Sequence, residues 1–235
     1  FFVACFSLAH SQAYAQVIFH EDFESGLDGW TVSEPWQIQS DTDTCGSLVA
    51  PFPVGSNAAY YGSSPGCNFL SYGWRSDLVM TDSVHVPEGM LTTLRWTGYE
   101  DTECTSCGWD WRRVTVFSDT HGTDDLVWAD GPMHVWNVQA VDLSDYAGQD
   151  IRISFWFDPV DHVDNGHLGW LIDDVTIEAT EAPEVYCETS PNSAGPGARI
   201  SWQGTTSISD NNFTLLATFL PLAEFGLFYY GPTAI

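Results

Sequence analysis

Apolar and polar residues alternate along most of this chain in short runs, which is the two-residue period of a β-strand. Such runs predict strands at residues 17–23, 36–39, 58–61, 77–86, 91–99, 111–118, 134–143, 151–157 and 168–177. Turn signals such as Leu27-Asp28-Gly29 and Asp164-Asn165-Gly166 separate them, and only residues 144–148 suggest a helical turn. Nine antiparallel strands at this spacing predict an all-β fold, a two-sheet jelly-roll sandwich of the concanavalin-like type.

The first fifteen residues differ from the rest. An apolar run over residues 1–9 is followed by Ala13-Tyr14-Ala15, the small-x-small pattern of a signal-peptidase site. We interpret residues 1–15 as a partial secretory signal peptide and exclude them from the fold. A membrane anchor is the weaker alternative, because a bilayer needs roughly 20 apolar residues.

The texture changes again after the ninth predicted strand. Residues 180–186 are rich in Glu, Ala and Pro and predict a linker that ends the sandwich domain of residues 16–179. Strand-like runs then recur at 198–202, 213–219 and 226–230. Residues 187–235 therefore predict a second, small β module, and its unpartnered apolar residues suggest that it is truncated.

Acidic residues dominate the charge. The chain has 32 Asp and Glu against six basic residues, all Arg, for a formal net charge of −26. Nucleic acids and anionic membranes are therefore unfavourable partners, whereas divalent cations are favourable ones. Aromatic residues make up 14% of the chain, with eleven Trp, and this is too much burial potential for a disordered acidic segment.

Five cysteines follow the predicted signal peptide. In an exported protein we expect disulfides, and loop-like flanks favour a bridge between Cys45 and Cys67 and another between Cys104 and Cys107. The alternative for the Cys104-x-x-Cys107 pair is half a zinc site or a redox motif. Cys187 is left over, and we expect its partner beyond residue 235.

Four segments together resemble a known family. They are HEDFESGLDGW (20–30), GWRSDLVMTDSVHVPEGMLTTLRWTGYEDTE (73–103), VDLSDYAGQDIRISFWFD (141–158) and GWLIDDVTI (169–177). In this order they resemble the MAM-like jelly-roll domains of secreted bacterial immune-inhibitor-type metallopeptidases, which are similar in outline to calcium-binding carbohydrate modules. The tail from residue 187 resembles a C-terminal module of planctomycete and related secreted proteins.

The resemblance implies a structural calcium between the first and last strands. The matching positions are Glu24, with Asp22 beside it, and one of the adjacent pair Asp173 and Asp174. Adjacent strand residues point to opposite faces, so only one of the pair reaches the ion unless a bulge intervenes; we favour Asp174. The alternative is that these aspartates are solvated at a sheet edge.

A second acidic cluster is a further candidate for a metal. Glu100, Asp110 and Asp158 lie among other carboxylates near the Cys104–Cys107 segment and the 158–166 turn. His162 and His167 could make this region attractive to zinc. The alternative is an ordinary solvated hairpin.

Tryptophans suggest a ligand platform. Trp109 and Trp111 are expected on one face of one strand beside acidic residues, with Trp74 as a third candidate; an apolar ring beside hydrogen-bonding groups suits a sugar. The alternative is that these rings belong to the core, where we expect a separate set: Trp30, Trp96, Trp156 and Trp170.

Catalytic motifs give no complete site. His-Glu-x-x-His is absent, and the Gly-x-Ser-x-Gly match at 62–66 lies in a loop context. The sequence thus predicts a secreted, monomeric, non-catalytic module, stabilised by calcium, that binds a glycan or an extracellular protein. The alternative is a jelly-roll hydrolase of polysaccharide that uses Glu100 and Glu103.

Overall fold

A computed structural model describes residues 2–6, 15–181, 191, 193–194, 197–203, 214–221 and 226–230. The chain divides into two compact units. One contains Val17–Glu88 and Thr92–Ala179, and the other contains Phe1–Gln16, Gly89–Leu91 and Thr180–Ile235. Cys187 and residues 182–186 of the predicted linker lie outside the described residues.

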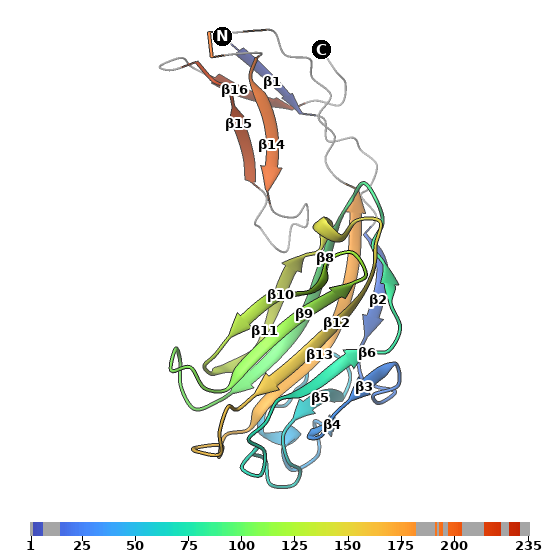
Figure 1. The fold of residues 1–235 in the computed structure, drawn as a ribbon, viewed down its shortest axis with the longest axis vertical. Coiled ribbons are helices and arrows are strands. Elements are labelled where there is room, and N and C mark those ends of the chain that lie inside the picture. Colours follow the sequence, from blue (N-terminus) through green and yellow to red (C-terminus); the bar gives the residue numbers. More distant parts are fainter. Residues whose placement is uncertain are drawn as a thin grey trace. The chain divides into compact units, whose positions relative to one another are not determined.

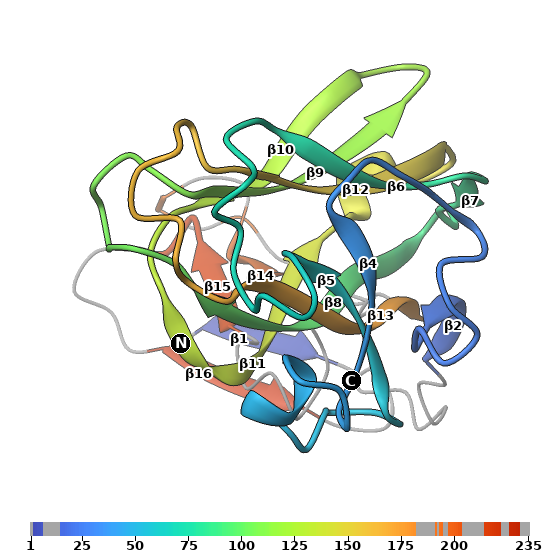
Figure 2. The same ribbon diagram turned by 90° about the horizontal axis from the view of Figure 1, so that it is seen from below.

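The larger unit is a sandwich of two sheets, seen as two layers in Figure 2. The first sheet has the order β10 (Gly122–Ala129), β9 (Trp111–Ser118), β12 (Asp150–Asp158), β6 (Ser76–Met80) and β3 (Trp30–Val32), with β7 (Val84–His85) also paired to β12. The second has the order β11 (Met133–Asp142), β8 (Met90–Asp101), β13 (Gly169–Glu181), β5 (Asn57–Tyr61) and β4 (Trp36–Ser40), with β2 (Gln16–Glu21) paired to β13 (Figure 1). The prediction of an all-β, two-sheet antiparallel jelly roll is confirmed.

The core lies between the two sheets because each strand turns alternate side chains inward. On β12, Phe155 and Phe157 are fully buried in this core, whereas Trp156 points to the opposite face. Other large core side chains come from both sheets: Trp30, Leu78, Val114 and Ile153 from the first, and Trp36, Tyr61, Trp96, Trp170 and Ile172 from the second.

A second apolar cluster lies on the other face of β5 and β13. Tyr60 and Leu171 alternate with the core residues of their strands and pack with Cys45, Val49 and Phe52 of the preceding loop, which contains a 3-10 turn at Gly46–Leu48. The disulfide from Cys45 to Cys67 fastens this loop, and a second disulfide joins Cys104 to Cys107. Both predicted pairings are confirmed.

A bulge in β13 accounts for the two adjacent aspartates. Trp170 and Ile172 face the core before it, and Val175 and Ile177 face the core after it, so the alternation shifts by one residue. Asp174 adopts a left-handed φ of 52°, a conformation in which Asp and Asn are enriched. The extra residue keeps both aspartates out of the core without breaking the strand.

Several boundaries differ from the predictions. The single predicted strand at 77–86 is two strands, β6 and β7, and β3 and β10 were not predicted. Asp124 and Asp125 interrupt the apolar pattern of β10, which is an edge strand and so needs little apolar surface. The linker was predicted from Thr180, but β13 continues to Glu181. The predicted turn at 144–148 is a 3-10 helix at Ser144–Tyr146.

The smaller unit contains two short sheets. In one, β14 (Arg199–Gln203) pairs antiparallel with β15 (Thr214–Thr218). In the other, β1 (Phe2–Phe6) pairs parallel with β16 (Gly226–Tyr230), so part of the segment set aside as a signal peptide forms a strand. None of the helices among the described residues has the length and apolar character needed to cross a membrane.

The two disulfides should differ in what they contribute to stability. Replacing Cys45 and Cys67 with Ala is expected to lower the free energy of unfolding by about 3 kcal/mol, because their sequence separation is 22. Replacing Cys104 and Cys107, separated by 3, should cost roughly half as much. Urea unfolding of both double variants measures this, and equal losses would contradict the loop-length argument.

Candidate functional site

A row of aromatic and charged side chains crosses the outer face of the first sheet. Trp128 on β10, Arg113 on β9, Trp156 on β12 and Asp77 on β6 are cross-strand partners in register. Because their strands are neighbours, these side chains form one transverse line. With the residues that contact them, they make up what we call the outer strip: Arg75, Asp77, Trp111, Arg113, Asp125, Trp128 and Trp156.

Two guanidinium groups stack on the indole rings of the outer strip. The Arg75 and Arg113 Cζ atoms lie 4.4 and 4.6 Å from the centroid of Trp156, and Arg113 Cζ lies 3.1 Å from that of Trp128. Trp156 is only 5% exposed, although it lies outside the core cluster. It was predicted to be a core residue; instead it is buried beneath arginines, which cover its ring through cation–π contacts.

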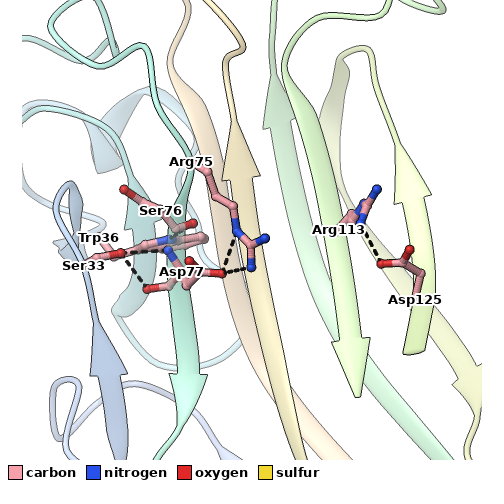
Figure 3. A network of polar contacts seen from close by, with 7 residues as sticks. All are labelled: Ser33, Trp36, Arg75, Ser76, Asp77, Arg113 and Asp125. Atoms are coloured by element: carbon pink, nitrogen blue, oxygen red, sulfur yellow. Dashed lines mark hydrogen bonds and ion pairs between the residues drawn. The ribbon is translucent and has the colours of Figure 1, made fainter. Parts of the chain in front are cut away.

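Carboxylates hold both arginines in place (Figure 3). Asp77 Oδ1 accepts hydrogen bonds from Arg75 Nε at 3.1 Å and Nη2 at 2.7 Å, and Asp125 Oδ1 accepts one from Arg113 Nη1 at 3.0 Å. The Asp77 backbone is itself tied to Ser33, whose Oγ accepts the Asp77 N–H at 2.8 Å. The polar groups of the outer strip are therefore ordered before any ligand arrives.

Trp128 is the exposed aromatic of the outer strip. Its side chain is 53% exposed, and its ring meets Trp111 edge to face, with centroids 5.3 Å apart and an interplanar angle of 85°. An ordered indole beside charged hydrogen-bonding groups can stack on the apolar face of a sugar while its neighbours bind the hydroxyls. Sequence reasoning missed Trp128 because it missed β10.

The three tryptophans predicted as ligand contacts are not brought together by any described ring contact. Trp111 belongs to the outer strip. Trp109 is exposed but precedes β9, so the expectation that it shares a strand face with Trp111 is wrong. Trp74, 51% exposed, packs edge-on against Tyr72 and His162 instead.

The predicted calcium residues come from neighbouring segments: Asp22 and Glu24 follow the end of β2, which pairs with β13, the strand that holds Asp173 and Asp174. The Glu24 carboxylate accepts hydrogen bonds from the backbone N–H groups of Ser56 at 2.7 Å and Asn57 at 2.6 Å, which lower its pKa. Gly55 has a left-handed φ of +60°, and a Cβ there would lie 2.4 Å from the Glu24 carboxyl group. The loop thus wraps closely around this carboxylate.

Asp173 is the buried member of the adjacent pair. Its carboxylate accepts the N–H groups of Val54 at 3.0 Å and Asp174 at 2.7 Å. Burial, helped by the negative charges of Asp174 and Glu24, raises the pKa of Asp173 to about 6, although its two backbone hydrogen bonds act in the opposite direction. Asp174 contacts His20 Nε2 at 3.1 Å, and Asp22 accepts the N–H of Glu24 at 3.1 Å.

The three residues of the second predicted acidic cluster, Glu100, Asp110 and Asp158, have different hydrogen-bond partners. Glu100, 1% exposed, accepts hydrogen bonds from the Asn137 and Gln139 side chains, at 3.1 and 2.9 Å. Burial raises its pKa, and the nearby Arg112 charge partly offsets this. Asp158 instead accepts the N–H of Val160 in a turn.

Asp110 is also buried, and one of its two oxygens is satisfied. Oδ2 accepts the N–H of Glu103 at 3.0 Å, whereas Oδ1 has no described partner. Burial raises the pKa of Asp110 to about 6.

One group of three potential metal donors is compact among the residues that the structure describes. The ligand atoms of Glu103, Cys104 and Cys107 lie within 4.8 Å of one another. The two sulfur atoms are joined in a disulfide and so are not thiolate ligands.

Comparison with known proteins gives no family for this chain. No protein-family model matches the chain, and no curated protein matches it. Among solved structures it is similar to the CBM22-1–GH10 modules of Clostridium thermocellum endo-1,4-beta-D-xylanase 10B complexed with xylohexaose, with 12% identity and a TM-score of 0.44. The match covers 76% of this chain and 31% of that chain.

Two further neighbours are similar over nearly their whole length. TmCBM61 in complex with beta-1,4-galactotriose has 16% identity and a TM-score of 0.44, covering 69% of this chain and 94% of that chain. The K3 cleaved adhesin domain of Lys-gingipain from Porphyromonas gingivalis has 17% identity and a TM-score of 0.39, covering 69% and 98%. Because these TM-scores are below 0.5, the neighbours carry no argument about what this chain binds.

Replacing Asp110 with Asn should stabilise the protein at neutral pH. The pKa of Asp110 is higher in the folded state than in the unfolded state. The free energy of unfolding of the wild type therefore falls as pH rises from about 4 to about 6. Asn removes the buried charge, can keep the bond to Glu103 and tolerates the left-handed φ of 54°.

Urea unfolding at pH 5 and pH 7 tests this. The Asp110→Asn variant should lose less stability than the wild type between the two pH values. Asp164→Asn is the matched control, since Asp164 also has a left-handed φ, 56°, but is exposed. Identical pH dependence in Asp110→Asn and the wild type would contradict the burial argument.

Proposed function

We propose that this chain is a secreted, non-catalytic module that binds a polysaccharide along the outer strip. The observation that carries the proposal is Trp128, a half-exposed indole fixed on one side by Arg113 and edge-on to Trp111. An aromatic ring ordered by its own neighbours loses little conformational entropy when a ligand stacks on it.

The dimensions of the outer strip suit an oligosaccharide. From Trp128 to Asp77 it crosses four neighbouring strands, and three inter-strand spacings of about 4.8 Å give a length of about 14 Å. The two arginines and two aspartates of the outer strip supply donors and acceptors for sugar hydroxyls. We therefore assign the binding of several consecutive sugar units to this face, and a protein ligand is the alternative.

Burial of Glu100 supports binding over hydrolysis. A glycosidase needs two carboxyl groups that flank the scissile bond. Glu100 lies inside the sandwich, held by Asn137 and Gln139, where a polysaccharide chain does not reach it. The Glu100–Glu103 pair therefore does not favour the alternative of a hydrolase.

Export and calcium complete the proposal. Two disulfides favour an oxidising compartment, in keeping with the predicted signal peptide. The mutual repulsion of Glu24, Asp173 and Asp174 is what a divalent cation would relieve, and calcium prefers such carboxylate and carbonyl oxygens. We propose that these three residues and Asp22 hold a structural calcium, as the resemblance to MAM-like domains implies.

Replacing Trp128 with Ala should abolish retention in affinity gels that contain xylan, galactan or another bound polysaccharide found on a glycan array. The free energy of unfolding should fall by only about 1–2 kcal/mol, because the ring is half-exposed and loses one cation–π contact with Arg113 and one edge-to-face contact with Trp111. Trp74→Ala is the matched control, with similar exposure and no described contact to the outer strip. Retention that Trp128→Ala leaves unchanged would refute the assigned face.

Calcium should raise the melting temperature of the chelator-treated protein. At millimolar calcium a micromolar site would add about 4 kcal/mol to the free energy of unfolding. Asp173→Asn should remove this response, whereas Asp150→Asn should keep it, because Asp150 is an exposed carboxylate at the start of β12 whose described partner is His85. A melting temperature that is the same with calcium and with chelator would contradict the proposed site.

A further inference from the structure

Two histidines and one aspartate meet at one end of the second sheet. Asp101 is the last residue of β8, His134 is the second residue of its neighbour β11, and His167 lies just before β13, the neighbour on the other side. His167 Nδ1 lies 3.1 Å from Asp101 Oδ1, and His134 Nδ1 lies 3.7 Å from the same oxygen. Three adjacent strand ends thus direct two imidazole nitrogens at one carboxylate oxygen.

The Asp101 carboxylate is fixed so that this oxygen stays available. Its other oxygen, Oδ2, accepts the backbone N–H of Leu168 at 2.9 Å. Because His167 directly precedes Leu168, the same segment places both the Leu168 N–H and the His167 imidazole against the Asp101 carboxylate. The group is open to solvent, since the His134 side chain is 60% exposed.

We propose that Asp101, His134 and His167 bind a divalent transition metal of the zinc class. Zinc binds imidazole nitrogen and carboxylate oxygen at about 2.0–2.2 Å, so in a tetrahedral site two ligand atoms lie about 3.3 Å apart. The two observed separations, 3.1 and 3.7 Å, bracket this spacing. Two imidazoles and one carboxylate suit zinc far better than calcium, which prefers oxygen ligands.

The His134 side chain must move before all three residues can bind one zinc ion. Unlike the donors of Glu103, Cys104 and Cys107, the three donor atoms do not all lie within 4.8 Å of one another. His134 is the most exposed of the three, so rotation of its side chain toward His167 closes the site at little cost in packing. Three protein ligands leave a fourth position for water.

The surrounding charge favours a cation. Glu103 and Asp110 both interact electrostatically with His167, and no Arg contact with Asp101 is described. In the other His–Asp contacts of the described residues, one imidazole meets one carboxylate, as in the pair His85 and Asp150 at 2.8 Å. Such a pair supplies two ligands, so it is a control for the proposed three.

Calorimetric titration of the tag-free, disulfide-intact chain with Zn²⁺ tests the site. The wild type should bind one zinc ion, and His134→Ala, His167→Ala and Asp101→Ala should each weaken binding at least tenfold. His85→Ala should bind like the wild type. Because His134 is exposed, the His134→Ala variant is expected to stay folded, and circular dichroism checks this. The His134→Ala variant therefore still tests the site if Asp101→Ala does not fold.

Two further readouts separate this site from the others. Co²⁺ should give visible absorption without the charge-transfer band of thiolate ligands, and excess Ca²⁺ should not displace Zn²⁺. Absence of zinc binding, wild-type affinity in His134→Ala and His167→Ala, a thiolate band, or displacement by calcium would each overturn the proposal. The outer strip and its polysaccharide contact are untouched by any of these results.

Discussion

Burial of alternate aromatic side chains between two sheets is the constraint on which the rest of this molecule depends. Phe155 of β12 packs against Trp96 across the core and against Trp30 of its own sheet, and Phe157 packs against Tyr61 across the core. Because side chains of a strand alternate, fixing these two rings inward forces Trp156 to the outer face. The core thus determines where the outer strip begins.

On the outer face of β12, two arginines cover the ring of Trp156. A tryptophan on an outer face would be a large exposed apolar surface, and two arginines cover it instead. Each guanidinium is neutralised by an aspartate, so the stack adds little net charge. A chain with only six basic residues places two of them here, which concentrates its scarce positive charge on one surface.

Negative charge is distributed by a different rule. Most of the carboxylates that the structure describes are at least partly exposed, where water screens their repulsion, but Glu100, Asp110 and Asp173 are buried and have raised pKa values. Burial of such groups lowers stability at neutral pH unless a partner compensates. Arg112 compensates Glu100, whereas the charges nearest Asp173 are other carboxylates. A buried carboxylate near an arginine charge thus differs from one surrounded by other carboxylates, which is a place suited to a cation.

The sequence by itself determined the fold class, most strands and both disulfide pairings, because period-two alternation and loop-flanked cysteines are local signals. It also pointed to the adjacent aspartates of β13, although the bulge that accommodates them became visible only in the shift of the core pattern after Ile172. What only the tertiary structure decided is which side chains meet. Trp128, Arg113, Trp156 and Asp77 come from four segments, and Asp101, His134 and His167 from three. Their proximity depends on strand order and register, which are set by long-range packing and leave no trace in local spacing.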